Sequence, residues 1–359
     1  MTFCKYCLLI ISVPIVICCS SPNDDVIGEE HAKEGSSEGT EGAYMEECKW
    51  IYSQMNRHYL WRQDMPDSVS CNYTTDPVTF FKSLLSPKDR FSYCERNTDY
   101  TRSQNIKNDE DDYTVVLTRS TSENVLIDTV YYINNKKIGY FCYLKFEGSA
   151  ELAPIIKKFK EANVDELIID LRYNPGGYVN TCKYLCNSLV NESAYGKIFQ
   201  SQGFNDILSH EMLVRYGRDM EDDYFDFPSD DNKHILGLPL YGLNMGRLYV
   251  LTSRYTASAS EALIVCLRPY NDVIVIGEKT VGKGVGSYII SDSKYKYMLH
   301  PITLRYYNAN IESTPDDGII PNYIVENGYE TKKREIGNTE EPLLQKAISL
   351  ISNHSENKE

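Results

Sequence analysis

Positive charge is scarce in this sequence: 37 Lys and Arg residues stand against 51 Asp and Glu, a formal net charge of −14. A protein that binds nucleic acid contacts the phosphates through a basic surface. We therefore expect no nucleic-acid partner. The 359 residues, 42% of them hydrophobic, are still enough to bury a sizeable core in one large domain or two ordinary ones.

Long hydrophobic runs are also scarce. Residues 6–17 form an apolar run that follows Lys5, but a permanent membrane-spanning helix needs about 20 apolar residues. The run has the form of a secretory signal and ends at Cys18-Cys19, with Val16 three positions before Cys19. This pattern resembles a lipobox and predicts a lipoprotein signal peptide over residues 1–18 with lipidation at Cys19. An uncleaved anchor and a plain secretory signal remain alternatives.

Lipidation would make the membrane a partner through the lipid anchor. Asp24-Asp25 follows the lipidated residue, and an acidic patch there favours export to the outer membrane in the cell envelope of a Gram-negative bacterium. Whether the protein faces the periplasm or the outside stays open, and so does its oligomeric state.

No CxxC or Cys/His spacing typical of zinc is present, so we expect no structural metal and no cofactor. Of the 11 cysteines, Cys4, Cys7 and Cys18 would leave with the signal, and Cys19 would be acylated. The rest are odd in number and cannot all pair internally. Cys182 and Cys186 lie one helical turn apart, which is typical of small core residues.

The chain divides by composition. Residues 19–43 are rich in Gly, Ser and Glu and predict a disordered tether. Residues 44–96 predict a small helical region, in which Asp76 caps a helix that begins at Pro77. Residues 97–119 are a polar linker, with at most one strand at 113–119.

Residues 120–351 are expected to form the core, followed by a tail over 352–359. Two strands, 125–133 and 137–146, precede an alternation of helices and apolar strands that is typical of an α/β sheet with parallel members. Three more strands and a helix over 341–351 close the pattern, and we find no internal repeats.

Three loops carry the residues of chemical interest. "DLRYNPGG" (170–177) and "TASASE" (256–261) each follow a buried strand, and "GEKTVGKG" (277–284) follows the next one. Open α/β sheets place their sites at the carboxyl ends of strands. Taken singly, each loop also has an ordinary explanation as a tight turn, a helix cap or a solvated lysine.

Together, in this order and spacing, the three motifs resemble those of the C-terminal processing (tail-specific) serine peptidase family, over residues 44–95 and 120–350. The resemblance implies a crotonase/ClpP-like α/β core with a mixed sheet and a small N-terminal helical region. It implies Ser258 as nucleophile and Lys283 as general base. It also implies an oxyanion hole built from Ala259 and from Gly176 or Gly177.

Glu261 stands one turn after the nucleophile and either supports the site or caps the helix. A lysine amine accepts a proton only when neutral, so Lys283 requires an apolar pocket that disfavours the ammonium form. Val281 and Val285 are suitable walls. The remaining candidate bases are histidines for which the sequence identifies no partner: His58, His210, His234 and His300.

Two features depart from the family pattern. The segment between Glu95 and Asn134 is too short for the PDZ domain that many members carry there, and Pro269 stands where some relatives have an assisting aspartate. The leading hypothesis is an envelope serine endopeptidase that cleaves peptides or unfolded proteins through a Ser/Lys dyad and an acyl-enzyme. The alternative is a catalytically inactive peptide- or lipid-binding protein on the same fold.

Overall fold

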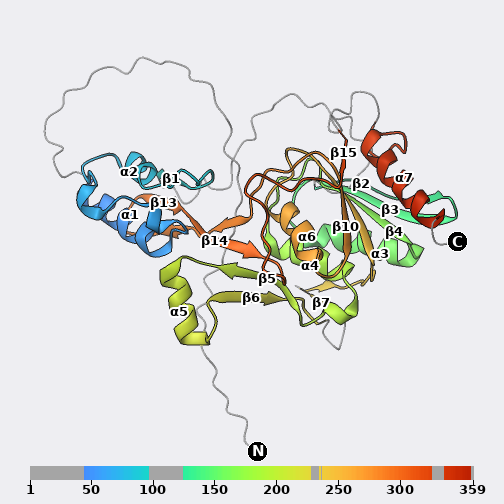
Figure 1. Ribbon diagram of the computed structural model, residues 1–359, viewed down its shortest axis with the longest axis horizontal. Coiled ribbons are helices and arrows are strands. Elements are labelled where there is room, and N and C mark those ends of the chain that lie inside the picture. Colours follow the sequence, from blue (N-terminus) through green and yellow to red (C-terminus); the bar gives the residue numbers. More distant parts are fainter. Residues whose placement is uncertain (1–43, 97–123, 228–233, 236, 326–334, 357–359) are drawn as a thin grey trace, which may run out of the picture.

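The computed structural model describes residues 44–96, 124–227, 234–235, 237–325 and 335–356. The expected signal peptide with Cys19, the tether over 19–43 and the linker over 97–119 lie outside these residues. Figure 1 shows a small N-terminal region at one side of a larger core. Within the described ranges no helix is long and apolar enough to cross a membrane.

The core is built on a six-stranded sheet of order β15-β10-β9-β4-β3-β2. Its strands are β2 (Val125–Ile133), β3 (Lys136–Tyr143), β4 (Glu166–Asp170), β9 (Arg247–Thr252), β10 (Asp272–Gly277) and β15 (Tyr323–Ile324). β2 and β3 form an antiparallel hairpin, and all other neighbours in the sheet are parallel. The expected α/β fold with a mixed sheet and a small N-terminal helical region is confirmed.

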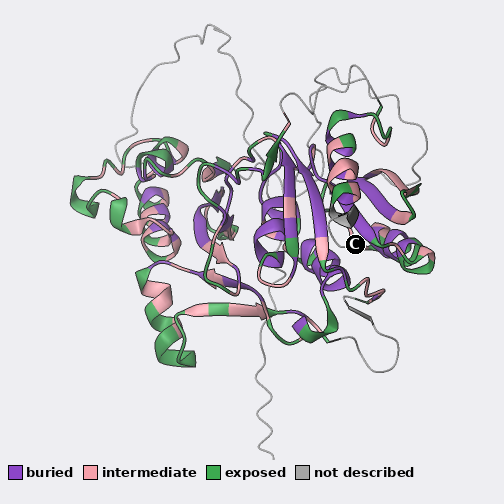
Figure 2. Cartoon of the chain, turned by 45° about the vertical axis from the view of Figure 1, so that its right-hand side comes forward, coloured by how far each residue is buried: buried purple, intermediate pink, exposed green. Residues whose placement is uncertain are grey.

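Helices cover both faces of this sheet. One face packs against α3 (Leu152–Ala162), α4 (Val179–Leu189) and α6 (Ala259–Leu267), and the other against α7 (Pro342–Glu356). Alternate residues of β4 serve the two layers, because successive strand side chains point to opposite faces: Leu167 and Ile169 to the first layer, Ile168 to the second. The central strands are accordingly the buried ones (Figure 2), and β4 is buried along its whole length, whereas the edge strands β2 and β15 are partly or fully exposed.

A second, antiparallel sheet has the order β11-β14-β5-β6. Its strands are β11 (Val285–Ser287), β14 (Ile302–Tyr307), β5 (Ile198–Gly203) and β6 (Met220–Tyr224), and α5 (Asp206–Tyr216) connects the last two. β5, α5 and β6 have no clear signal in the sequence, because β6 is acidic and α5 buries none of its side chains. A short hairpin, β7 (His234–Ile235) with β8 (Leu238–Pro239), also belongs to the core.

The N-terminal region contains α1 (Met45–His58) and α2 (Pro77–Ser83), with Asp76 capping α2 through the N–H of Thr79 at 3.1 Å, as predicted. It is not purely helical, because it ends in β1 (Tyr93–Arg96). β1 pairs antiparallel with β13 (Tyr297–His300), which pairs with β12 (Ile290–Ser291). β12 and β13, which follow β11 in the chain, therefore join the N-terminal region to the core. Short 3₁₀ turns lie at Arg62–Asp64, Ser68–Ser70, Ser149–Glu151 and Glu192–Ala194.

A fully buried arginine ties the end of β4 to the start of α7. Arg172 pairs with Asp170 at 2.8 Å and with Glu341 at 2.7 Å, and all three side chains are inaccessible or nearly so. Tyr140 donates a hydrogen bond to Asp170, and Glu341 accepts the N–H of Leu344 at the start of α7. Because each charge has a partner, the network avoids the large penalty of an unpaired buried ion.

Candidate active site

The three motif loops meet at one edge of the six-stranded sheet. β4, β9 and β10 are parallel neighbours, so the segments that follow them leave the sheet at the same end. The loops also touch: the N–H of Ala257 donates to Asn174 O at 3.2 Å, and the N–H of Val281 donates to Thr256 O at 3.0 Å. The order of the strands therefore brings the three motif loops together.

Ser258 occupies the turn between β9 and α6. Its φ of 55° is in the left-handed region, which costs a residue other than glycine about 1–3 kcal/mol. A Cβ at Gly176 would lie 2.8 Å from the Cβ of Ser258 and 2.9 Å from Ala259 N, so only glycine lets this loop approach so closely. Ser260 braces the turn by donating its hydroxyl to Asn174 O at 2.9 Å.

The two glycines differ in their hydrogen bonding. Gly176 donates its N–H to the Asn174 side chain at 2.9 Å, whereas the N–H of Gly177 takes part in none of the hydrogen bonds among the described residues. Ala259 is the first residue of α6, where a helix leaves N–H groups without an intrahelical acceptor. Two backbone donors are thus available, Gly177 in the loop after β4 and Ala259 directly after Ser258.

Glu261 is fully buried and joins two of the loops. Its Oε2 accepts the backbone N–H of Ser258 at 2.9 Å and that of Lys283 at 2.8 Å. Its Oε1 accepts the N–H of Gly282 at 2.7 Å and the hydroxyl of Thr280. Burial raises the pKa of the Glu261 carboxyl, and these four donors act in the opposite direction by stabilising the carboxylate. One side chain therefore fixes the backbones of Ser258 and Lys283 relative to each other.

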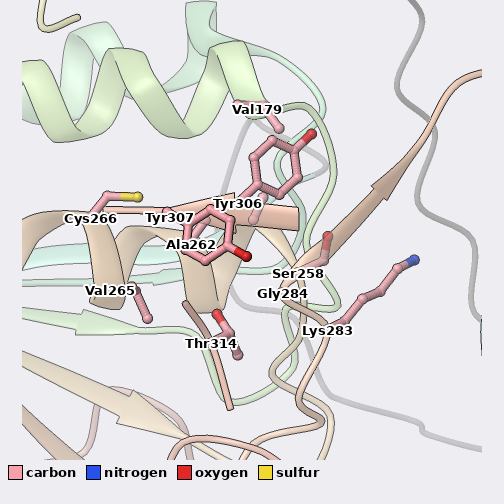
Figure 3. A pocket seen from close by; sticks show the side chains of 11 residues that line it. Val179, Ser258, Ala262, Val265, Cys266, Lys283, Gly284, Tyr306, Tyr307 and Thr314 are labelled. Atoms are coloured by element: carbon pink, nitrogen blue, oxygen red, sulfur yellow. The ribbon is translucent and has the colours of Figure 1, made fainter. Parts of the chain in front are cut away.

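The Lys283 side chain is largely buried, with 9% of its surface exposed. Its amine makes no hydrogen bond or ion pair with any residue that the structure describes; Nζ lies over the ring of Phe91, 5.1 Å from the centroid. Figure 3 shows the amine extending away from the Ser258 hydroxyl. Of the expected walls, Val285 is buried and Val281 is half-buried.

Phe91 and its neighbour Arg90 are site residues that the sequence motifs did not predict. Arg90 donates to three backbone carbonyls of the core, at Gly282 (2.9 Å), Asp316 (2.7 Å) and Val281 (3.3 Å). Both residues belong to the loop between α2 and β1, and the core residues that Arg90 contacts lie 191 to 226 positions later in the sequence. No local pattern in the sequence signals such a contact.

A narrow cavity of about 10 Å³ opens beside Ser258 (Figure 3). Its lining is mainly apolar and aromatic: Val179, Ala262, Val265, Cys266, Tyr306 and Tyr307. A space of this size holds about one water molecule. Without rearrangement it therefore admits only a small apolar group.

Of the histidines considered as alternative bases, His58, His210 and His300 do not line this cavity. His58 and His210 border a separate cavity of about 750 Å³ near α5, and His300 stacks on Tyr93 in the N-terminal region. Across the described ranges, no group of three or more His, Cys, Asp or Glu side chains is placed to hold a metal ion.

Replacing Glu261 by glutamine tests whether this carboxylate organises the site. The amide of glutamine keeps one acceptor oxygen, but its NH₂ group faces backbone N–H donors that then have no acceptor. Each buried donor left without an acceptor costs about 1–3 kcal/mol. We expect Glu261→Gln to lower the free energy of unfolding by about 2–4 kcal/mol in urea denaturation. Glu161→Gln, on the exposed side of α3, should change it by less than about 0.5 kcal/mol. Equal stability of the two variants would contradict the role assigned to Glu261.

Two family models match the chain. Residues 137–325 match Peptidase family S41, and residues 46–93 match the Peptidase S41 N-terminal domain. The second range covers most of the described N-terminal region, and the first covers the three motif loops.

Curated relatives include probable CtpA-like serine proteases from Staphylococcus aureus, 24% identical over 166 residues, and from Staphylococcus saprophyticus, 23% identical over 165. The aligned part is 45% of this chain and 28% of each relative, so the match spans little more than a quarter of their length. The predicted resemblance to the C-terminal processing peptidases is confirmed.

Among solved structures, a candidate S41 protease from Bacteroides fragilis superposes with a TM-score of 0.65 at 23% identity, covering 90% of this chain and 99% of that one. A candidate peptidase from Parabacteroides merdae superposes with a TM-score of 0.50 at 16% identity, covering 86% and 96%. These likenesses show the fold. The Peptidase family S41 model matches residues 137–325, which are more than half of this chain, so the chain belongs to peptidase family S41.

Proposed function

We propose that this protein is a serine peptidase that cleaves peptides or unfolded proteins, with Ser258 as nucleophile and Lys283 as general base. The observation that carries the proposal is the Glu261 carboxylate, one oxygen of which accepts the backbone N–H of both residues. A nucleophile and a base act together only when their mutual geometry is fixed. Here one buried group holds both backbones.

In the first step a neutral Lys283 amine takes the proton of the Ser258 hydroxyl as Oγ attacks the scissile carbonyl carbon. The resulting ammonium then gives this proton to the leaving amine nitrogen as the C–N bond breaks, which leaves an acyl-enzyme on Ser258. A water molecule hydrolyses the ester, with Lys283 again accepting and returning a proton. To reach Oγ, the lysine side chain must rotate away from Phe91, which its flexible stem permits.

The tetrahedral intermediates need two N–H donors, each worth about 3 kcal/mol of transition-state stabilisation. We assign them to Ala259 and Gly177, because Gly176 already donates its N–H to Asn174. Gly176 then has a steric role, since it lets the loop lie against the Ser258 turn.

The alternative is an inactive binding protein on the same fold. The position of the Lys283 amine, over Phe91 instead of at Ser258, is the observation that favours it. The strained backbone of Ser258 favours the enzyme, because backbone strain persists mainly where a function requires it. The four hydrogen bonds that Glu261 accepts at the site favour it as well.

Chemical acylation of Ser258 distinguishes an active peptidase from an inactive binding protein. A serine-directed probe should label the purified protein between pH 6 and 10 and should fail to label Ser258→Ala. Lys283→Met should slow labelling by about 100-fold or more, the usual contribution of a general base. Lys279→Met serves as the matched control, because Lys279 lies in the same loop but is half exposed. A wild-type protein that binds peptides and is never labelled would instead favour the inactive protein.

The apolar cavity beside Ser258 supports a preference for small apolar side chains on the acyl side of the cleaved bond. Ala262 lines it one turn after Ser258, so Ala262→Leu fills the available space. We expect this variant to lower kcat/KM at least ten-fold for peptides with alanine at that position, because the added leucine side chain leaves no room for the methyl group. Peptides with glycine there provide the internal control and should be cleaved at the wild-type rate. An equal loss for both peptides would argue against this cavity as the specificity site.

We further propose that the protein is anchored in the cell envelope of a Gram-negative bacterium by a lipid on Cys19, at the outer membrane. The support is the apolar run over 6–17, the pattern that ends at Cys19, and Asp24-Asp25 after it. Radiolabelled fatty acid should be incorporated in cells that express the wild type and should be lost in Cys19→Ser. Incorporation that survives this substitution would exclude Cys19 as the lipidated residue.

A further inference from the structure

The partner of the Lys283 amine comes from outside the peptidase core. Phe91 lies between α2 and β1, and its ring centroid is 5.1 Å from Nζ, within the range of a cation–π interaction. Asp89 fixes the backbone at this point, because its Oδ1 accepts the N–H of Phe91 and that of Ser92, each at 2.9 Å. Its Oδ2 accepts the hydroxyl of the buried Tyr59 at 2.7 Å. The ring is therefore held in place by the N-terminal region.

The same loop grips the backbone that carries the lysine. Arg90 donates to Gly282 O and Asp316 O, and its guanidinium lies 4.8 Å from the centroid of the Phe91 ring. Arg90 thus joins the N-terminal region to the backbone directly before Lys283, and Phe91 lies against the Lys283 amine.

A ring face attracts an ammonium group and not a neutral amine. We propose that Phe91 is a positioning residue for Lys283: its ring holds the charged amine away from Ser258 in the resting enzyme, and the amine leaves the ring when it loses its proton. This inference rests on the proposed Ser258/Lys283 dyad. It makes the N-terminal region a determinant of the pH at which the peptidase becomes active.

Other charged groups near Lys283 also influence the titration of its amine, so the test must leave them unchanged. They are the Glu261 carboxylate on α6, Arg90, the Arg305–Asp316 pair at 2.8 Å on β14 and the loop after it, and the exposed Lys279–Asp317 pair at 3.4 Å. A substitution of Phe91 alters none of these charges. Its effect on the titration of the amine therefore reports the ring.

The test measures the pH dependence of the Lys283 amine directly. Full-length protein is treated with acetic anhydride between pH 6 and 11, and acetylation of Lys283 is read by peptide mass spectrometry. Phe91→Leu should move the midpoint of reactivity to lower pH by about 0.5 to 1.5 units, the equivalent of one cation–π interaction. Labelling of Ser258 at pH 7 should become about three- to thirty-fold faster, because more of the amine is neutral.

Two variants control for altered packing. Phe91→Tyr keeps the ring and should keep the wild-type midpoint. Trp50→Leu removes another aromatic side chain of the N-terminal region, one that stacks on Tyr295 at 4.9 Å, and should also leave the midpoint unchanged.

An unchanged or higher midpoint in a folded Phe91→Leu protein would overturn the inference, and so would an equal shift in Trp50→Leu. Failure of the proposed function gives a different result. Ser258 would then resist labelling at every pH, while acetylation of Lys283 would still show whether the ring holds the charged amine.

Discussion

The geometry of the active site depends on the hydrogen bonds that converge on the buried carboxylate of Glu261. Ser258 and Lys283 belong to loops that follow different strands, and Ser258 is held in a conformation that costs free energy. Four donors fixed by the surrounding backbone satisfy the carboxylate and offset much of its desolvation. Because these contacts exist before any substrate binds, the two residues need no large reorganisation of the backbone during the reaction.

This arrangement in turn requires a rigid frame, which the segment around Arg172 supplies. The Arg172 side chain pairs with Asp170 and Glu341 inside the protein, while its backbone carbonyl accepts the hydroxyl of Ser253 in the loop before Ser258. One residue therefore links the end of β4, the start of α7 and the loop before Ser258. An ionic network of this kind is a costly way to gain stability, but it specifies one arrangement of the three segments.

Much of the site could be predicted from the sequence because its parts are encoded locally. The apolar strands β4, β9 and β10 are continuous in the sequence, and parallel neighbours release their loops at one edge, so the loops that carry Gly176, Ser258 and Lys283 lie together. The segment from β5 to β6 was missed because its strands and helix bury few apolar residues and show no clear period. Phe91 was missed because pairing of β1 with β13, distant in the sequence, brings it to the site.

Phe91 and Arg90 connect the two matched segments of the chain at Lys283. Glu261, from the core, holds the backbone of Lys283 on one side; Arg90 and Phe91, from the N-terminal region, hold the same loop and its amine on the other. The region is also joined to the core by the hydrogen bond from the N–H of Leu60 to Ile302 O, at 2.8 Å. The position of the Lys283 side chain therefore depends on both parts of the chain. Residues 46–93 and 137–325 are therefore coupled at this loop, and movement of the N-terminal region changes the environment of the lysine.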